Sequence, residues 1–337
     1  MADGRILPLR NWLPSDEDRH AFALAGVVLA LGVGLTFASD QFLTWRNLLE
    51  TLESVAFSGV LAVGLLVVLI SGGIDISFAA VASVAQYALA IVLSRVDGGW
   101  ALAFAVAGGV GLALGIVNGA LVHGLRTSPI IVTIATMNLY YGLLVYASGG
   151  RWLYDFPDWF VGGVDFLSLP DGAGGLYRVT LQIGVLIASV AGVAALLGGT
   201  ALGRQIRALG GAPEAARRLG FPIARLHLAV YGLMGLLAGV AGLVQSQLVL
   251  SVAPTALVGR ELDVLAALVL GGASLDGGKG GVIGTVLGLA LVAMVQNGLT
   301  LVGVSSYWHQ VVIGAVVLVS VTVTAGSKVR SATGATA

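Results

Sequence analysis

The stretch of this chain that most resembles a catalytic motif departs from that motif at two positions. "GGASLDGGKGG" at 271–281 has the glycines and the lysine of a phosphate-binding loop. The loop pattern G-x-x-x-x-G-K-[ST] needs a glycine where Ala273 stands, and a Ser or Thr where Gly280 follows Lys279. We therefore expect that this chain binds no ATP itself and holds no cofactor.

Metal-binding and nucleophilic patterns give no better indication of an enzyme. The sequence has no cysteine, so a disulfide framework and a thiolate metal site are both excluded. Its histidines are far apart and lack the spacing of metal ligands; they are His20, His123, His227 and His309. With a net charge of zero, the overall balance gives no sign of nucleic-acid binding. We expect neither an enzyme nor a metal protein.

Composition indicates a membrane protein. Hydrophobic residues make up 57% of the chain and charged residues 10%, whereas soluble domains average roughly 45–50% and 25%. A charge at the centre of a membrane span costs about 2.5–3.5 kcal/mol, so charged residues should mark the membrane boundaries. The N-terminal residues include several acids and lead into an apolar run too long for a signal peptide, which predicts an uncleaved anchor.

Uncharged runs that approach the length of about twenty residues needed for a span recur along the sequence. They predict an all-α integral membrane protein, a polytopic bundle of about ten transmembrane helices. The run 262–274 is the shortest, and a buried helix or a re-entrant hairpin is its alternative. The runs are 21–39, 54–74, 76–94, 100–121, 129–149, 179–198, 228–250, 262–274 and two helices within 280–327, separated near "GVSSYW" at 303–308.

The positive-inside rule orients these spans. With the N-terminus inside, ten spans place twelve Lys and Arg residues in the cytoplasm and five outside, whereas nine spans give nine and eight. Ten spans are therefore favoured. The predicted layout is a cytoplasmic N-terminal segment (1–20), a transmembrane domain (21–326) with an external loop (150–178) and a large cytoplasmic loop (199–227), and a cytoplasmic tail (327–337).

The cytoplasmic loop gathers charge and has an ordered sequence. "RQIRALGGAPEAARRLGFPIAR" at 204–225 holds five of the seventeen Lys and Arg residues. Pro213 suits the first turn of a helix, and Glu214 suits the positive end of the helix dipole. Gly220 can take a left-handed cap, and Pro222 cannot continue the helix. The pattern predicts a short helix and a sharp turn, although a basic loop that only anchors the topology would explain the arginines equally well.

These residues resemble the EAA loop of membrane permeases in bacterial ATP-binding-cassette importers. Two stretches are similar to signatures of the ribose, xylose and galactose class of these permeases: "LISGGIDIS" at 69–77 and "LDVLAALVLGGASLDGGKGGVIGTVLG" at 262–288. The later "NGLTLVGVSSYWHQVVIGAVVLVSV" is similar too, so the resemblance covers about residues 40–325. The chain lacks the Ile-x-Leu-Pro ending that follows the loop glycine in some importer permeases.

The resemblance implies the partners and the location. The protein would lie in the bacterial inner membrane, pair with a second permease copy or a paralogue, and carry a sugar from a periplasmic or extracellular sugar-binding protein. The external loop 150–178 is rich in Trp, Tyr, Phe and Asp, which suits a lid or a docking surface for that protein. An aromatic belt with a surface loop is the alternative. A separate ATPase subunit would use the ATP and hold the coupling loop, whose residues are Glu214, Ala215, Ala216, Arg217, Arg218 and Gly220.

Within the "SGGIDIS" signature we expect a turn and a helix cap. Gly72 and Gly73 let the chain turn at the cytoplasmic face, and Asp75 or Ser77 can accept hydrogen bonds from free amides at the start of the next helix. Contact with substrate is the alternative for Asp75. Two sets of glycines with four-residue spacing predict close helix packing; they are Gly111, Gly115, Gly119 and Gly280, Gly284, Gly288.

Polar residues inside the spans are neutral amides, which suit a hydroxyl-rich neutral solute better than an amino acid or a coupling ion. Intramembrane polar groups tend to face a cavity, although a hydrogen bond between helices is the alternative for each one. The substrate-pathway candidates are Gln86, Asn118, Asn138, Gln245, Gln296 and Asn297. Alternative functions are a permease for autoinducer-2 or another small solute, or a stand-alone ion-coupled secondary transporter with inverted repeats.

Overall fold

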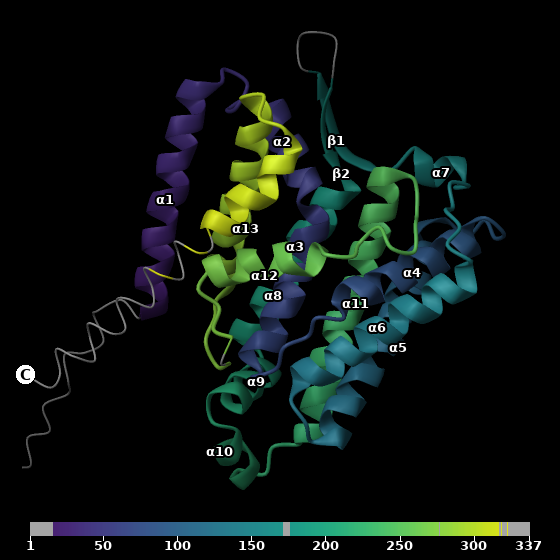
Figure 1. Cartoon of the computed structure of the whole chain (residues 1–337), viewed down its shortest axis with the longest axis vertical. Helices are drawn as coiled ribbons and strands as arrows, with labels where there is room; N and C mark the ends of the chain where they lie inside the picture. Colours follow the sequence, from purple (N-terminus) through teal and green to yellow (C-terminus); the bar gives the residue numbers. More distant parts are fainter. Residues whose placement is uncertain (1–15, 171–175, 276, 317, 319–321, 323–337) are drawn as a thin grey trace, which may run out of the picture.

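The computed structural model describes residues 16–170, 176–275, 277–316, 318 and 322, and it is built almost entirely of helices (Figure 1). The elements are α1 (Asp16–Ala38), α2 (Trp45–Ser54), α3 (Ala56–Ile70), α4 (Phe78–Leu93), α5 (Gly99–Leu125), α6 (Pro129–Ser148), α7 (Asp158–Val161), β1 (Asp165–Pro170), β2 (Leu176–Thr180), α8 (Leu181–Gly199), α9 (Ala201–Gly211), α10 (Pro213–Arg218), α11 (Ile223–Val249), α12 (Arg260–Leu270), α13 (Val282–Leu301) and a 3-10 turn (Ser306–Trp308). The all-α expectation missed the antiparallel hairpin β1–β2.

Six of the described helices are long and apolar enough to cross a membrane, or seven if α2 and α3, bent by 53°, form one span. α4 is shorter, with 16 residues. α12 has 11 residues, about 16 Å of helix, so the run 262–274 is too short to cross the membrane and fits the buried-helix alternative. Of the second helix expected within 280–327, residues 309–316 are described and helical, whereas 317, 319–321 and 323–327 lie outside the described residues. The expected count of about ten spans is therefore not confirmed.

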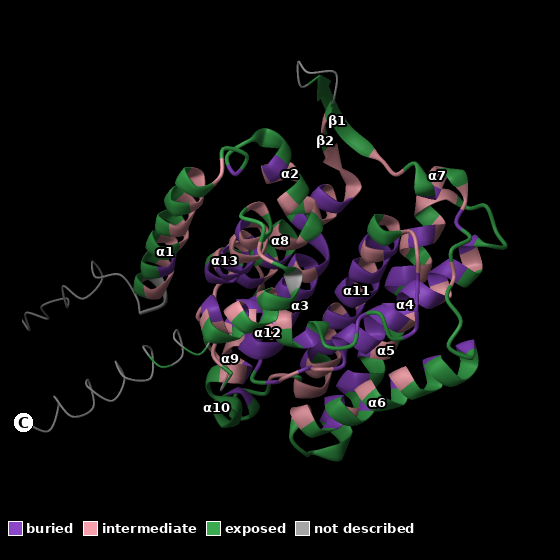
Figure 2. Ribbon diagram, turned by 45° about the horizontal axis from the view of Figure 1, so that its top comes forward, coloured by how far each residue is buried: buried purple, intermediate pink, exposed green. Residues whose placement is uncertain are grey.

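The core of the protein is formed around α3. All its residues except Ser58 are buried, and it packs against α8, α11 and α12. α1 is the opposite case, since only 6% of its apolar stretch is buried inside the protein. Figure 2 shows this contrast between a buried centre and the exposed α1 at the edge. Apolar residues all around both helices are compatible with α3 facing protein and α1 facing lipid.

Glycines bring α5 and α11 together, as the four-residue spacing predicted. A Cβ built on Gly111 would lie 2.8 Å from the amide nitrogen of Gly239, and one on Gly115 would lie 2.9 Å from the Cα of Gly235. In the second set, Gly288 approaches the backbone of Gly271 at the end of α12. Gly280, however, precedes α13 and is not part of that helix contact.

The hairpin and α10 lie at opposite ends of the molecule (Figure 1). The hairpin belongs to the loop 150–178 that was expected outside, and α10 belongs to the loop 199–227 that was expected in the cytoplasm. A loop outside the cell and a loop in the cytoplasm must lie at opposite ends of a membrane protein, and these two loops do.

Candidate functional site

The coupling loop forms the short helix and the turn that its sequence predicted. α10 begins at Pro213 and ends at Arg218. The amide of Gly220 donates to the carbonyl of Arg217 (3.0 Å), and the amide of Phe221 donates to that of Ala216 (3.1 Å). These two bonds form a Schellman cap, which needs a left-handed residue. Gly220 supplies it with a φ of 75°.

α10 presents an open surface at its end of the molecule. Glu214, Ala215, Arg217 and Arg218 are exposed, whereas Ala216 faces inward and is buried. Arg217 donates to Glu214 at 3.1 Å, an ion pair of one helical turn whose side chains are both largely exposed. Such a pair contributes less than about 1 kcal/mol. The helix is thus free to bind a partner with this pair and with the exposed Leu219.

The signature turn after α3 builds a buried polar network. The Asp75 carboxylate accepts hydrogen bonds from the amide (2.8 Å) and the hydroxyl (2.7 Å) of Ser77. The Asn118 amide group donates to the Ser77 hydroxyl at 2.6 Å, and the Tyr140 hydroxyl donates to the Asn118 carbonyl oxygen at 3.0 Å. The network therefore ties the turn to α5 and α6.

The capping prediction for this turn is right in part. Asp75 accepts an amide, but it is the amide of Ser77, the N-cap residue itself, and the Ser77 side chain makes no capping bond to α4. The physical reason is competition, because the Ser77 hydroxyl is engaged by Asp75 and Asn118 instead. Burial raises the pKa of the Asp75 carboxyl to about 6, against the lowering effect of these hydrogen bonds.

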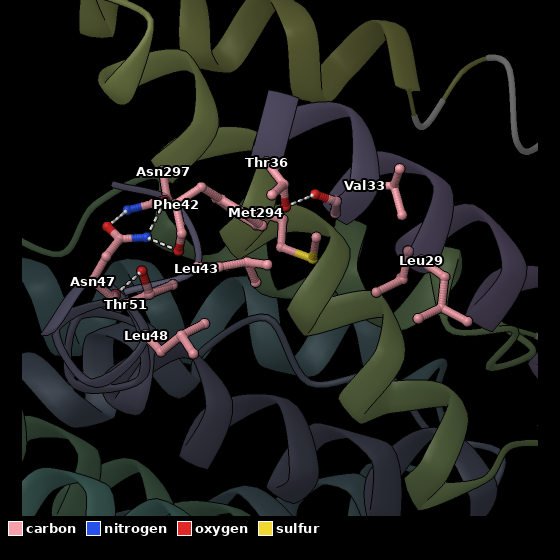
Figure 3. Close-up of a pocket in the computed structure, with 12 residues that line it drawn as sticks. Leu29, Val33, Thr36, Phe42, Leu43, Asn47, Leu48, Thr51, Met294 and Asn297 are labelled. Atoms are coloured by element: carbon pink, nitrogen blue, oxygen red, sulfur yellow. Dashed lines mark hydrogen bonds between the residues drawn. The ribbon is translucent and has the colours of Figure 1, made fainter. Parts of the chain in front are cut away.

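The amide candidates do not gather at one place. Asn118 belongs to the buried network described above. Asn138 is exposed, and its amide group donates to the carbonyl of Ile134 in its own helix. Asn297 exchanges two hydrogen bonds with Asn47, at 2.8 and 3.1 Å. Figure 3 shows this pair beside an apolar pocket of about 320 Å³ between α1, α2 and α13.

The other three candidates lie on helices of the bundle. Gln86 is buried in α4, and a Cβ built on Gly242 in α11 would lie 3.3 Å from its Cβ. Gln245 and Gln296 are half-buried in α11 and α13. The six amides therefore come from five different helices. For Asn118 and Asn297 the geometry provides the alternative, a hydrogen bond between helices.

Beneath the hairpin lies a polar cavity of about 490 Å³, which sequence reasoning did not anticipate. Arg46 donates to Glu50 at 2.9 Å, and Arg178 lies 3.6 Å from Asp165. The side chain of Gln182 donates to that of Gln247. The polar side chains that line the cavity are Arg46, Glu50, Glu53, Asp165, Tyr177, Arg178, Thr180, Gln182 and Gln247.

The signal that could have found this cavity was the clustering of charge around 46–53 and 165–178. Those residues contributed only to the topology count, because nothing in their spacing shows that α2, the hairpin and α8 meet. The structure also brings together His123 and His227, whose ring centroids are 5.6 Å apart. In the described residues no group of three or more His, Cys, Asp or Glu side chains could hold a metal ion.

Known proteins similar to this chain are permeases. A family model described as "Branched-chain amino acid transport system / permease component" matches residues 47–321. The ribose import permease protein RbsC of Escherichia coli (strain K12) is 34% identical over 328 residues, which cover 95% of this chain and 96% of the relative. RbsC of Bacillus subtilis (strain 168) is 36% identical over 294 residues, covering 85% and 87%.

A third relative is the L-arabinose ABC transporter permease protein AraH of Azospirillum brasilense. It is 32% identical over 297 residues, which cover 88% of this chain and 84% of the relative. No solved structure matches the chain. The family match runs from α2 to beyond α13 and includes the coupling loop, the signature turn and the polar cavity. The chain is a multi-pass membrane protein and belongs to this family of transport-system permease components.

Proposed function

We propose that this chain is the membrane conduit of an ATP-binding-cassette importer for a neutral sugar. The observation that carries the proposal is the exposed helix α10, held by its Schellman cap at the end of the molecule opposite the hairpin. An ATPase subunit that uses the ATP would dock there, on Glu214, Ala215, Arg217, Arg218 and the turn at Gly220. Ala216 faces inward and fixes the helix.

A neutral sugar is the substrate class favoured by the chemistry of the polar groups. The relatives are named for ribose and L-arabinose, and the amides of the bundle offer donors and acceptors without net charge. A stand-alone ion-coupled transporter leaves the exposed α10 without a role. Autoinducer-2, which resembles a sugar, is the alternative within the same importer class.

The polar cavity is our proposed external end of the pathway. Its volume lies in the range of small-molecule sites, about 300–1,000 Å³, and its two arginines and three acidic residues supply both donors and acceptors for hydroxyl groups. The hairpin above it exposes Phe166, Leu167, Leu169 and Leu176. These apolar side chains suit contact with an external sugar-binding protein that delivers the sugar.

The remaining parts of the assembly follow from the same proposal. The chain would lie in the bacterial inner membrane, surrounded by lipid and paired with a second copy or a paralogue. Residues 21–326 would form the transmembrane permease domain, with its external loop at 150–178 and its coupling loop at 199–227. Residues 1–20 and 327–337 would be cytoplasmic segments.

Reconstitution tests the function. The chain would be purified with its ATPase and its external binding protein, placed in proteoliposomes, and supplied with labelled ribose, L-arabinose, autoinducer-2 or leucine. We expect ATP-dependent uptake of one neutral sugar, stimulated by the binding protein and unaffected by ionophores that collapse proton and sodium gradients. Uptake of leucine in preference to every sugar would contradict the substrate class, and abolition of uptake by the ionophores would contradict the importer class.

A further inference from the structure

The helix that precedes α10 contacts two distant turns of the chain through glycine backbones. α9 ends with Gly210 and Gly211. The first turn (71–73) follows α3, and the second (277–281) precedes α13. Both belong to stretches that resemble family signatures, but no sequence pattern predicts a contact between them. We call this contact, made by Gly72, Gly210, Gly277 and Gly278, the glycine junction.

A hydrogen bond between the two turns lies at the centre of the junction. The amide of Gly278 donates at 3.1 Å to the carbonyl of Ile70, the last residue of α3, where helix carbonyls lack partners within the helix. Gly210 lies against this bond. A Cβ built on it would overlap the Ile70 carbonyl oxygen and lie 2.8 Å from the Gly278 nitrogen and 2.9 Å from the Gly72 nitrogen. Every side chain other than hydrogen would push the backbones apart.

A further hydrogen bond ties α9 to the second turn, and two buried side chains hold the helix in place. One helical turn before Gly210, the guanidinium of Arg207 donates at 3.2 Å to the carbonyl of Gly280, which adjoins the start of α13. Ile206 and Leu209 are buried and hold α9 in place. A movement of α9 therefore has to move the end of α3 and the start of α13 with it, because packed interiors transmit displacement.

From the first turn the contact continues into the bundle. Asp75 and Ser77 follow the glycines of this turn, and their hydrogen bonds reach Asn118 in α5 and Tyr140 in α6. The contacts thus connect the exposed helix α10 with the buried helices α5 and α6. At Gly210 this connection consists of backbone atoms alone.

We propose that the glycine junction passes the movement of the coupling loop to the two signature turns, with Gly210 as its positioning residue. The proposal rests on the proposed function, since it takes an ATPase docked on α10 as the source of movement. Gly210 touches neither sugar nor ATP. Its role is to let the coupling loop and both turns move as one unit.

The test uses a matched pair of neighbouring glycines in the complete importer. Gly210→Ala places a methyl group on the Ile70–Gly278 hydrogen bond, whereas Gly211→Ala meets no atom within 4 Å. We expect Gly210→Ala to co-purify with the ATPase and keep its basal ATP hydrolysis, but to lose at least tenfold of sugar uptake and of stimulation by the binding protein. Gly211→Ala should match the unsubstituted importer in every assay.

A second pair keeps the proposal testable if Gly210→Ala does not fold. Arg207→Gln removes the bond to Gly280 without a steric clash, and Arg204→Gln changes an exposed arginine of the same helix. We expect Arg207→Gln to lower the amount of sugar carried per ATP at least twofold with an unchanged melting temperature, and Arg204→Gln to leave this ratio unchanged.

Normal sugar uptake and normal stimulation in Gly210→Ala would overturn the proposed role of the junction. If that variant does not fold, a normal ratio of sugar to ATP in Arg207→Gln would do the same. Equal losses in the two variants of either pair would also overturn it. Failure of the unsubstituted importer to take up any sugar would instead count against the proposed function, so the two failures are distinguishable.

Discussion

Two regions of this protein bring backbones into contact through glycine, and they differ in purpose and in how the sequence encodes them. Between α5 and α11, glycines spaced by four residues line one face of a long helix and meet a similar face. At the glycine junction, single glycines come from a helix end and two turns in three separate parts of the sequence. The first contact is a regular seam within the bundle, and the second is an irregular contact between the bundle and its coupling loop.

The difference shows what a glycine does in each setting. In the seam, replacing one glycine separates α5 and α11 along their length, so the substitution lowers the stability of the fold. At the junction, the surrounding helices keep their own packing when a glycine is replaced. The substitution therefore impairs the transfer of movement from the coupling loop to the two turns. Substitutions should therefore separate loss of fold from loss of coupling.

The largest effect is expected in the seam. Gly115→Leu would drive a branched side chain into the backbone of Gly235, and we expect a loss of more than about 3 kcal/mol of stability, which would leave little folded chain. Gly109 in the same helix is exposed, and a Cβ built on it meets no atom within 4 Å, so Gly109→Leu should insert and fold normally. The yield of monodisperse protein in detergent measures both. A well-folded Gly115→Leu variant would show that the seam is not a close contact.

The next effect is expected at Gly220, where glycine is needed for its left-handed backbone conformation and not because a side chain would clash. Nothing lies within 4 Å of a Cβ on Gly220, but its φ is 75°. Gly220→Val should strain the backbone by about 1–3 kcal/mol and displace α10, abolishing stimulated ATP hydrolysis in a chain that still folds. Gly220→Asn should keep most of the stimulation, because Asn tolerates the left-handed conformation. Equal stimulation in both variants would mean that the cap does not orient α10.

The sequence predicted those features whose signal is local or periodic. The seam follows from four-residue spacing, and α10 follows from Pro213, Glu214 and Gly220. The glycine junction and the polar cavity depend on where turns and the hairpin meet in space, which no spacing records. The amides illustrate the limit: Asn118 and Asn138 are the same residue type in neighbouring helices, yet one is buried in a network and the other is exposed.

This contrast between the two asparagines gives a smaller effect. Asn118→Leu removes one hydrogen-bond partner from each of the hydroxyls of Ser77 and Tyr140, which keep the Asp75 carboxylate and the Leu114 carbonyl as partners. We expect a loss of about 0.5–1.5 kcal/mol, the typical net contribution of a hydrogen bond. Asn138→Leu should change stability little, because it loses only a bond to its own helix. Thermal unfolding in detergent compares the two variants. Equal melting temperatures would show that the network around Asn118 does not stabilise the core.

The smallest effect is expected from the arginines of α10, which the junction does not use. Changing both Arg217→Gln and Arg218→Gln removes two of the twelve positive charges expected inside, and the remaining ten should still orient the chain. Because the native chain has no cysteine, single cysteines report sidedness directly. In this background Gly211→Cys should stay shielded from an impermeant thiol reagent added outside cells, while Val96→Cys, in the exposed connection between α4 and α5, should react. Labelling of position 211 from outside would show that these two arginines set the topology, so that α10 would orient the chain as well as couple it.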